Sequence, residues 1–301
     1  MKIKNHLSKL AALFSVTMLT FAVSCVDEVV PYQEEAAYVS EDAITDAYFE
    51  DADDMAGVVM LSDAGTDDGS GGKIKSTRPI DMKWDHRFKC DGVVVTITIT
   101  DPNPEHPIGD ISIDFGTEGC TDARGNVRKG IINIHFDGRR FISGSTVTTT
   151  FDGYEINGIQ LEGTRVLTNV STSTQDLPKF QVELTDGKAT WPDGTTATRN
   201  HCIVRQWILG NTRLEDRLEV SACPDVTPTA YGTNRRGVEY QMTIIEPLVY
   251  KRACPFMAVS GVKQFVAEGK TITIDYGDGE CDRIVVITID GRSRDVRVGN
   301  R

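Results

Sequence analysis

The chain has 301 residues, 40% of them hydrophobic and 25% charged, which is ordinary for a soluble globular protein and gives room for one large or two small domains. The formal net charge of −12 is uneven, because residues 26–72 contain fourteen Asp or Glu and no Lys or Arg, whereas residues 73–301 contain 29 basic and 30 acidic residues. A nearly neutral body argues against nucleic acid as a partner, which would require a basic stripe. The acidic stretch is typical of a solvated, self-repelling tether, with cation binding as the alternative.

The first 24 residues have the pattern of an export signal. Three lysines precede an apolar run over residues 10–23, which is too short to span a bilayer comfortably and has the length of a signal-peptide core. The end of this run resembles a bacterial lipoprotein signal, with Ala22 in place of the usual Leu. The resemblance implies that Cys25 is acylated and becomes the new N-terminus, anchored stably if it carries two or more acyl chains such as palmitate. An ordinary signal peptide with a chance cysteine is the alternative.

Two acidic residues, Asp27 and Glu28, follow Cys25 almost at once. They resemble the surface-export signal of Bacteroidota lipoproteins. This resemblance implies that the protein is lipid-anchored in the outer membrane and exposed at the cell surface. The periplasmic face of the membrane is the alternative location.

Residues 40–61 are expected to form a helix. Ser40 is a suitable N-cap, and the acidic residues after it suit the positive end of the helix dipole. The expected apolar stripe, which Asp51 interrupts, consists of Ile44, Tyr48, Met55, Val58 and Val59. A polar, glycine-rich linker over residues 65–72 follows the helix.

From about residue 76 onward the apolar residues recur with a period of two, which is typical of half-buried antiparallel strands. The clearest runs are 93–100, 111–115, 132–136, 147–151, 180–184, 272–276 and 285–289. Asp-Gly pairs begin at Asp91, Asp137, Asp152, Asp186, Asp193, Asp278 and Asp290, and Asn157 begins an Asn-Gly pair. Because both pairs suit tight hairpins, the sequence predicts a mainly β fold, either an antiparallel sandwich or one continuous curved sheet.

An internal sequence repeat indicates a duplicated β module. The sequence over residues 111–120 resembles that over residues 272–281, and each copy is followed by an apolar strand that ends in Asp-Gly-Arg. The expected organisation has four parts: a signal peptide over residues 1–24, an acidic tether with a helix over 25–75, and β modules over 76–190 and 191–301.

The six cysteines other than Cys25 are expected to form disulfides, because an even number in an exported chain is typical of them. Consecutive cysteines bracket strand pairs and lie nearly equidistant from the turn between them, and opposed hairpin residues are within disulfide range. The predicted pairs are Cys90 with Cys120, Cys202 with Cys223, and Cys254 with Cys281. A zinc site is disfavoured, since the sequence has no Cys-x-x-Cys and only His201 adjoins a cysteine.

The alternation, turns and cysteines over residues 76–301 resemble those of uncharacterised lipoproteins of Bacteroidota. The resemblance implies a fold and a location, and it carries no activity with it.

No residue pattern indicates an enzyme. The sequences around Ser145 and Ser260 lack the Gly-x-Ser-x-Gly elbow, and oxidised cysteines are not nucleophiles. Acidic clusters occur near Asp114 and Asp278, where turn chemistry is expected and calcium binding is the alternative. We therefore expect no catalytic residue, no metal and no cofactor.

Three functions remain open from the sequence. The first is a non-enzymatic surface lipoprotein that binds or scaffolds a macromolecule in adhesion or envelope assembly. The second is a carbohydrate-binding accessory lipoprotein that uses exposed aromatics among Trp84, Trp191 and Trp207. The third is a carrier of lipid or another apolar ligand. The ligand and the oligomeric state are not determined by the sequence.

Overall fold

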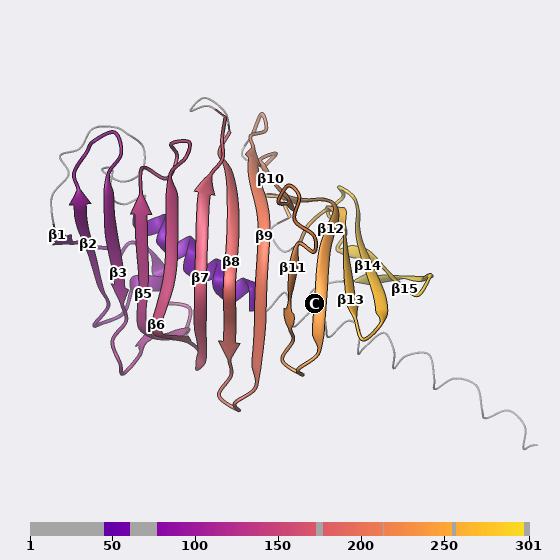
Figure 1. Ribbon diagram of the computed structural model, residues 1–301, viewed down its shortest axis with the longest axis horizontal. Coiled ribbons are helices and arrows are strands. Elements are labelled where there is room, and N and C mark those ends of the chain that lie inside the picture. Colours follow the sequence, from indigo (N-terminus) through magenta and orange to yellow (C-terminus); the bar gives the residue numbers. More distant parts are fainter. Residues whose placement is uncertain (1–44, 61–76, 173–176, 213, 255–256, 298–301) are drawn as a thin grey trace, which may run out of the picture. The chain divides into compact units, whose positions relative to one another are not determined.

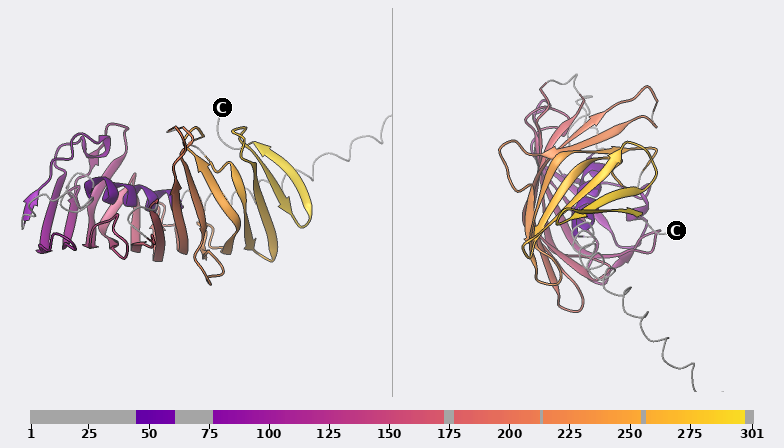
Figure 2. Two further views of the ribbon diagram at one scale, coloured as in Figure 1. Left: turned by 90° about the horizontal axis from the view of Figure 1, so that it is seen from above. Right: turned by 90° about the vertical axis from the view of Figure 1, so that its right-hand side faces the viewer.

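The computed structural model describes residues 45–60, 77–172, 177–212, 214–254 and 257–297. Their main feature is one antiparallel sheet of sixteen strands, with a single helix over residues 45–60. Strands that are consecutive in the chain are neighbours along most of the sheet, from β1 at one edge to β16 at the other, with β4 and β11 off the main path (Figure 1). The helix lies across the strands on one face, which we call the inner face (Figure 2). The continuous sheet, and not the sandwich, is therefore the correct alternative.

The strands account for most of the described chain. They are β1 (Thr77–Pro79), β2 (Val94–Asp101), β3 (Ile108–Asp114), β4 (Cys120–Thr121), β5 (Val127–Asp137), β6 (Thr146–Ile156), β7 (Ile159–Asn169), β8 (Lys179–Thr190), β9 (Thr196–Ile208), β10 (Arg217–Ala222), β11 (Ala230–Thr233), β12 (Glu239–Lys251), β13 (Ser260–Ala267), β14 (Lys270–Asp278), β15 (Ile284–Ile289) and β16 (Arg292–Arg297). A short 3-10 helix, η1 (His86–Phe88), precedes β2.

The period-two pattern decides which residues form the core. On β2, Val95, Ile97 and Ile99 are buried, while the threonines between them are only partly covered. The same alternation continues through the two copies of the internal sequence repeat, with buried isoleucines at 111 and 113 on β3 and at 272 and 274 on β14. The alternating apolar residues of the predicted runs thus lie on the inner face, as the physics of a half-buried sheet requires, whereas Val94, which is 51% exposed, and Val286 have the opposite orientation.

The helix buries a slightly different stripe from the expected one. Its buried apolar residues are Phe49, Ala52, Met55, Ala56, Val59 and Met60. Tyr48 and Val58 are only half-buried, and Ile44 lies outside the described residues. Phe49 packs edge-on against Phe151 of β6, with the ring centroids 5.9 Å apart.

A line of β-bulges crosses the sheet from β5 to β9. The register shifts at residues 129–131, 150–155, 162–164 and 184–187, and glycines occupy the bulges. Gly130 has a positive φ, and a Cβ built on it would lie 2.2 Å from the carbonyl oxygen of Gly153. A Cβ on Gly163 would similarly lie 2.8 Å from the Cα of Gly187. Side chains are therefore excluded where the strands bend.

Two Asp-Gly pairs consequently lie inside strands and do not form hairpins, and Asp91-Gly92 lies between η1 and β2 and not between two strands. Asp152 and Gly153 lie within β6, and Asp186 and Gly187 lie within β8. The expectation of a turn is wrong at both places, because a bulge needs the same small residues and positive φ angles as a hairpin. Asn157, Asp193 and Asp290 do precede the expected turns between strands.

Residues 41–301 form one compact unit. β8 and β9 are paired from Lys179 with Gln206 to Thr190 with Thr196, so the hairpin that joins the two expected modules is hydrogen-bonded along its length. The core is consequently continuous across residue 190.

Candidate functional site: the two faces of the sheet

The inner face combines an apolar core with a cluster of basic side chains beneath the helix. We call this cluster the basic cluster, and its members are Arg128 on β5, Arg165 on β7, and Arg199, His201 and Arg205 on β9. The side chains of Arg165, Arg128 and Arg199 are 1%, 2% and 3% exposed. Buried guanidinium groups require charged partners, and here the helix provides them.

The first contact involves Asp46, near the start of the described helix. Its Oδ1 lies 3.2 Å from Nε of Arg199 and 3.6 Å from Nδ1 of His201. Burial, with the nearby charge of Glu50, raises the pKa of Asp46 to about 6. Burial also lowers the pKa of His201 well below its ordinary value, and neighbouring arginine charges add to this, so the imidazole is neutral.

The second contact joins Glu50 to two arginines. Oε1 of Glu50 accepts a hydrogen bond of 2.9 Å from Nη2 of Arg165 and is also paired with Arg205. Burial alone would raise the pKa of Glu50, but the charges of the two arginines outweigh it and lower the pKa to about 2. Asp53, one turn further on, lies 3.5 Å from Nε of Arg165. Glu50 and Asp53 thus neutralise one pair of arginines.

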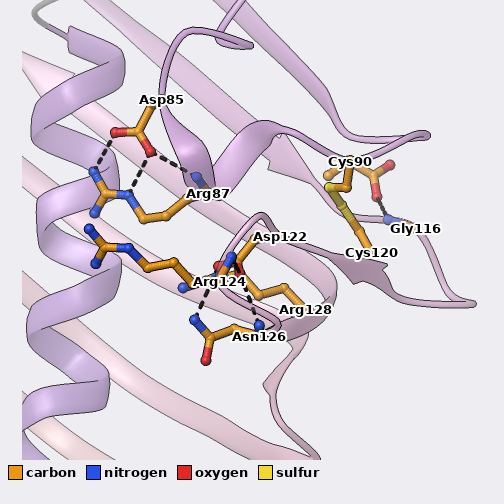
Figure 3. The surroundings of a disulfide bond; sticks show 10 residues. Asp85, Arg87, Cys90, Gly116, Cys120, Asp122, Arg124, Asn126 and Arg128 are labelled. Atoms are coloured by element: carbon orange, nitrogen blue, oxygen red, sulfur yellow. Dashed lines mark hydrogen bonds and ion pairs between the residues drawn. A yellow bond between two sulfur atoms is a disulfide. The ribbon is translucent and has the colours of Figure 1, made fainter.

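The third contact involves Arg128 and two carboxylates. Its Nη2 donates a hydrogen bond of 2.8 Å to Oδ2 of Asp51, and its Nη1 donates to Asp122. Asp122 also accepts bonds from the backbone N–H groups of Arg124 and Asn126, at 2.8 and 2.9 Å (Figure 3). Arg128 therefore connects the helix, β5 and the turn after β4.

Sequence reasoning missed this interface. Asp46, Glu50 and Asp53 are spaced i, i+4 and i+7, which places them on one helical stripe, whereas the acidic composition of residues 26–72 predicts a solvated tether. The charged residues of the basic cluster share one face of their strands with apolar residues. On β9, Ile203 lies between His201 and Arg205 on that face. That alternation was the available signal, since a charged residue at a core position of a strand requires a buried partner.

The pH dependence of stability should report on Asp46. Its folded carboxyl keeps a proton up to about pH 6, whereas the unfolded one releases it near 3.8, so falling pH adds stability through Asp46. His201 acts in the opposite direction. As the pH falls below about 6.5, His201 takes up a proton in the unfolded chain but stays neutral in the folded one, so the fold loses stability. As the pH falls from about 7 to about 5, we expect the free energy of unfolding of Asp46→Asn to drop by about 1–2 kcal/mol relative to that of the wild type, because the variant lacks the contribution of Asp46. Urea unfolding at several pH values measures this difference, and parallel profiles for the two proteins would contradict it.

The opposite face, which we call the outer face, carries polar side chains over β2, β3, β5 and β6. Strand register aligns Thr98, Asp110, His135 and Thr148 in one row across these strands. A second, parallel row consists of Thr96, Ser112, Asn133 and Thr150. The two rows line a shallow groove of about 440 Å³.

A hydrogen-bonded pair, His135 with Asp110, lies in the middle of the outer-face groove. Nδ1 of His135 is 2.9 Å from Oδ1 of Asp110, and the two side chains are 49% and 58% exposed. The hydroxyl, amide, imidazole and carboxylate groups of the groove can donate and accept hydrogen bonds at a spacing set by the strands. The groove is therefore a candidate binding surface for an extended polar chain.

The structure joins the cysteines in consecutive pairs. Cys90 is bonded to Cys120, Cys202 to Cys223, and Cys254 to Cys281, with Cα–Cα distances of 5.6, 5.5 and 5.9 Å. Three disulfides in one chain indicate an extracytoplasmic protein. Cys25, Asp27 and Glu28 lie outside the described residues.

The acidic turns act through backbone hydrogen bonds. Asp114, Asp275 and Asp278 each accept a bond from the N–H two residues later. No group of three or more potential metal ligands occurs within the described ranges.

The three tryptophans are not gathered on one surface. Trp84 is 61% exposed before η1, and Trp207 is 46% exposed near the end of β9. Trp191 is half-buried at the turn between β8 and β9, where the guanidinium of Arg235 lies 4.8 Å from its ring centroid. They do not form the row of aromatics that would make a single sugar platform.

No family model, curated protein or solved structure matches the chain. Within the part of the chain that the structure describes, no helix has the length and hydrophobicity needed to cross a membrane.

Proposed function

We propose that this protein is a non-enzymatic lipoprotein of the cell surface that binds a macromolecular partner, in adhesion or envelope assembly. In this proposal lipid on Cys25 anchors the chain in the outer membrane, and Asp27 and Glu28 direct it to the outer face. The outer-face groove is the observation that carries the binding role, because it offers two rows of polar side chains on a rigid sheet. The disulfides support an extracytoplasmic location.

Carbohydrate is the second candidate for the bound molecule. Exposed Trp84 and Trp207 support it only as separate stacking rings, since one aromatic ring beside polar groups can hold a sugar, and neither of them lines the groove. A carrier of an apolar ligand has less support, because helix residues 45–60 already cover part of the apolar inner face.

Binding through the groove is tested by a double substitution. We expect His135→Ala with Asn133→Ala to weaken saturable binding of the labelled, exported chain to envelope preparations by about tenfold, because two central hydrogen-bonding groups are lost. The matched control is Gln241→Ala, an exposed residue on β12 outside the groove. Equal binding by both variants would contradict the proposal, and competition by purified envelope polysaccharide would favour the carbohydrate candidate.

The anchoring part of the proposal has a separate test. Protease is added to intact cells that carry a C-terminally tagged chain, with a periplasmic protein as the control. Loss of the tag while the control survives is expected. Survival of the tag until the cells are lysed would place the chain on the periplasmic side and remove the role of Asp27 and Glu28. Release of Cys25→Ser from membranes tests the lipid directly.

A further inference from the structure

One row of short polar side chains on the outer face is longer than the groove. The groove row that contains Thr150 on β6 continues in register to Thr164 on β7 and Thr185 on β8. The complete row, which we call the hydroxyl row, crosses six neighbouring strands and consists of Thr96, Ser112, Asn133, Thr150, Thr164 and Thr185. Because neighbouring strands lie about 4.8 Å apart, the row is about 24 Å long.

The side chains of the hydroxyl row present their polar groups to solvent. All six are half-buried or exposed, and none of them makes a side-chain hydrogen bond within the described residues. By contrast, Thr198 on β9 is bonded to Thr233 on β11 through the two hydroxyl groups, which are 2.9 Å apart. Since hydroxyl and amide groups both donate and accept hydrogen bonds, the row offers donors and acceptors along its whole length.

The hydroxyl row lacks the features of a surface that binds a protein. The centre of a protein interface is enriched in aromatic and apolar side chains, which supply most of the binding energy. No described residue of the row or of the groove lining is a large exposed hydrophobic one, although Val94 lies beside Thr96 on this face. An added peptide strand is excluded as well, because neighbours on both sides already pair these strands, as Ser112 and Thr150 do with Asn133.

The charges beside the hydroxyl row disfavour a charged polymer. The row itself contains no ionisable side chain. In the adjacent row, Asp110 is hydrogen-bonded to His135 and Glu183 accepts a bond from Gln181. Asp110 and Glu183 repel a polyanion, and neither row has a Lys or Arg that would attract one. A polycation gains little from a row without charge, so a neutral chain rich in hydroxyl groups is the best complement.

We infer that the outer-face groove binds a neutral polysaccharide, whose chain lies across the strands along the hydroxyl row. This inference rests on the proposed binding role of the groove and names the class of its ligand. The binding surface then extends to Thr164 and Thr185, which do not line the groove itself. Each sugar makes a few hydrogen bonds without an aromatic ring to stack on, so that affinity comes from many weak contacts along one chain.

The test measures saturable binding of the labelled, exported chain to envelope preparations that are treated beforehand. Periodate cleaves sugars between neighbouring hydroxyl groups and is quenched before the protein is added, whereas protease removes polypeptide. We expect periodate to weaken binding by about tenfold, because the hydrogen-bonding partners are destroyed, and protease to leave it unchanged. Binding that survives periodate, or that only protease removes, would overturn the inference and leave the binding role intact. No saturable binding to untreated envelopes would remove both.

The course of the ligand along the row is tested by a pair of double substitutions. Thr164→Val with Thr185→Val removes two hydroxyl groups beyond the groove, and valine is well suited to a strand. We expect binding to the untreated envelopes to weaken about fivefold, because two hydrogen bonds are lost. The matched control is Thr190→Val with Thr196→Val, two threonines that are paired on β8 and β9 away from the row. Equal binding by the two double variants would overturn the inference.

Discussion

Arg128→Met is expected to lower the free energy of unfolding by about 3–5 kcal/mol. The arginine side chain is 2% exposed and neutralises Asp122 and Asp51, of which Asp122 is 1% exposed at its side chain. Methionine keeps much of the volume but removes both ion pairs, so that a buried carboxylate is left with one charge partner fewer. Urea unfolding followed by far-ultraviolet circular dichroism measures the loss.

The control for this prediction lies four residues earlier. Arg124→Met removes the same charge from an exposed side chain, and we expect a change within about 0.5 kcal/mol. A second readout is acid stability. Hydrogen bonds from Asn126, Arg128 and Arg124 lower the pKa of Asp122 to about 2 against the opposing effect of burial. Its contribution to stability is therefore lost only as the pH falls from about 4 towards 2, and Arg128→Met should move this loss to higher pH. Similar losses in the two variants would contradict a special role for Arg128.

Gly130→Ala is expected to cost about 3 kcal/mol or more, which makes it the second large effect. Gly130 has φ of +77°, a conformation that costs other residues about 1–2 kcal/mol. The added Cβ would also lie 2.2 Å from the carbonyl oxygen of Gly153, which is backbone and cannot rotate away. The bulge shared by β5 and β6 would have to open, and thermal unfolding would report a lower Tm.

Gly125 separates the two causes. Its φ of +86° is similar, but nothing lies within 4 Å of an added Cβ. Gly125→Ala should therefore lose only the conformational part, about 1–2 kcal/mol. Equal losses at 125 and 130 would mean that the close approach of β5 to β6 contributes nothing, and that the line of bulges is not tightly packed.

Local patterns in the sequence predicted β2, β3, β5, β6, β8, β14 and β15, but no predicted run covers strands such as β7 and β12. The alternation of Val95, Ile97 and Ile99 with threonines predicted a strand with one buried face, and the structure confirms it. The helix expected over residues 40–61 is confirmed for the described residues 45–60, although its buried stripe includes Phe49, which the expected stripe lacks. These predictions succeed because the periods of a strand and a helix depend only on residues a few positions apart.

The sequence did not show that two identical local patterns form different structures. Asp152-Gly153 and Asp193-Gly194 are the same dipeptide, but the first lies in a bulge of β6 and the second in the turn between β8 and β9. Only the partner strand distinguishes them, since a bulge is defined by the register across two strands.

The sequence by itself determined a hairpin-rich antiparallel β protein with one helix and an acidic N-terminal segment. The tertiary structure alone decided that the strands form one sheet, that Asp46, Glu50, Asp51 and Asp53 contact it, and that a polar groove opens on the other face. The count of charges along the chain suggested a neutral body and a solvated tether, because such a count does not tell which charges meet in the folded structure. Burial supplies that information, since an arginine such as Arg165 can remain in a core only where a carboxylate from elsewhere in the chain meets it.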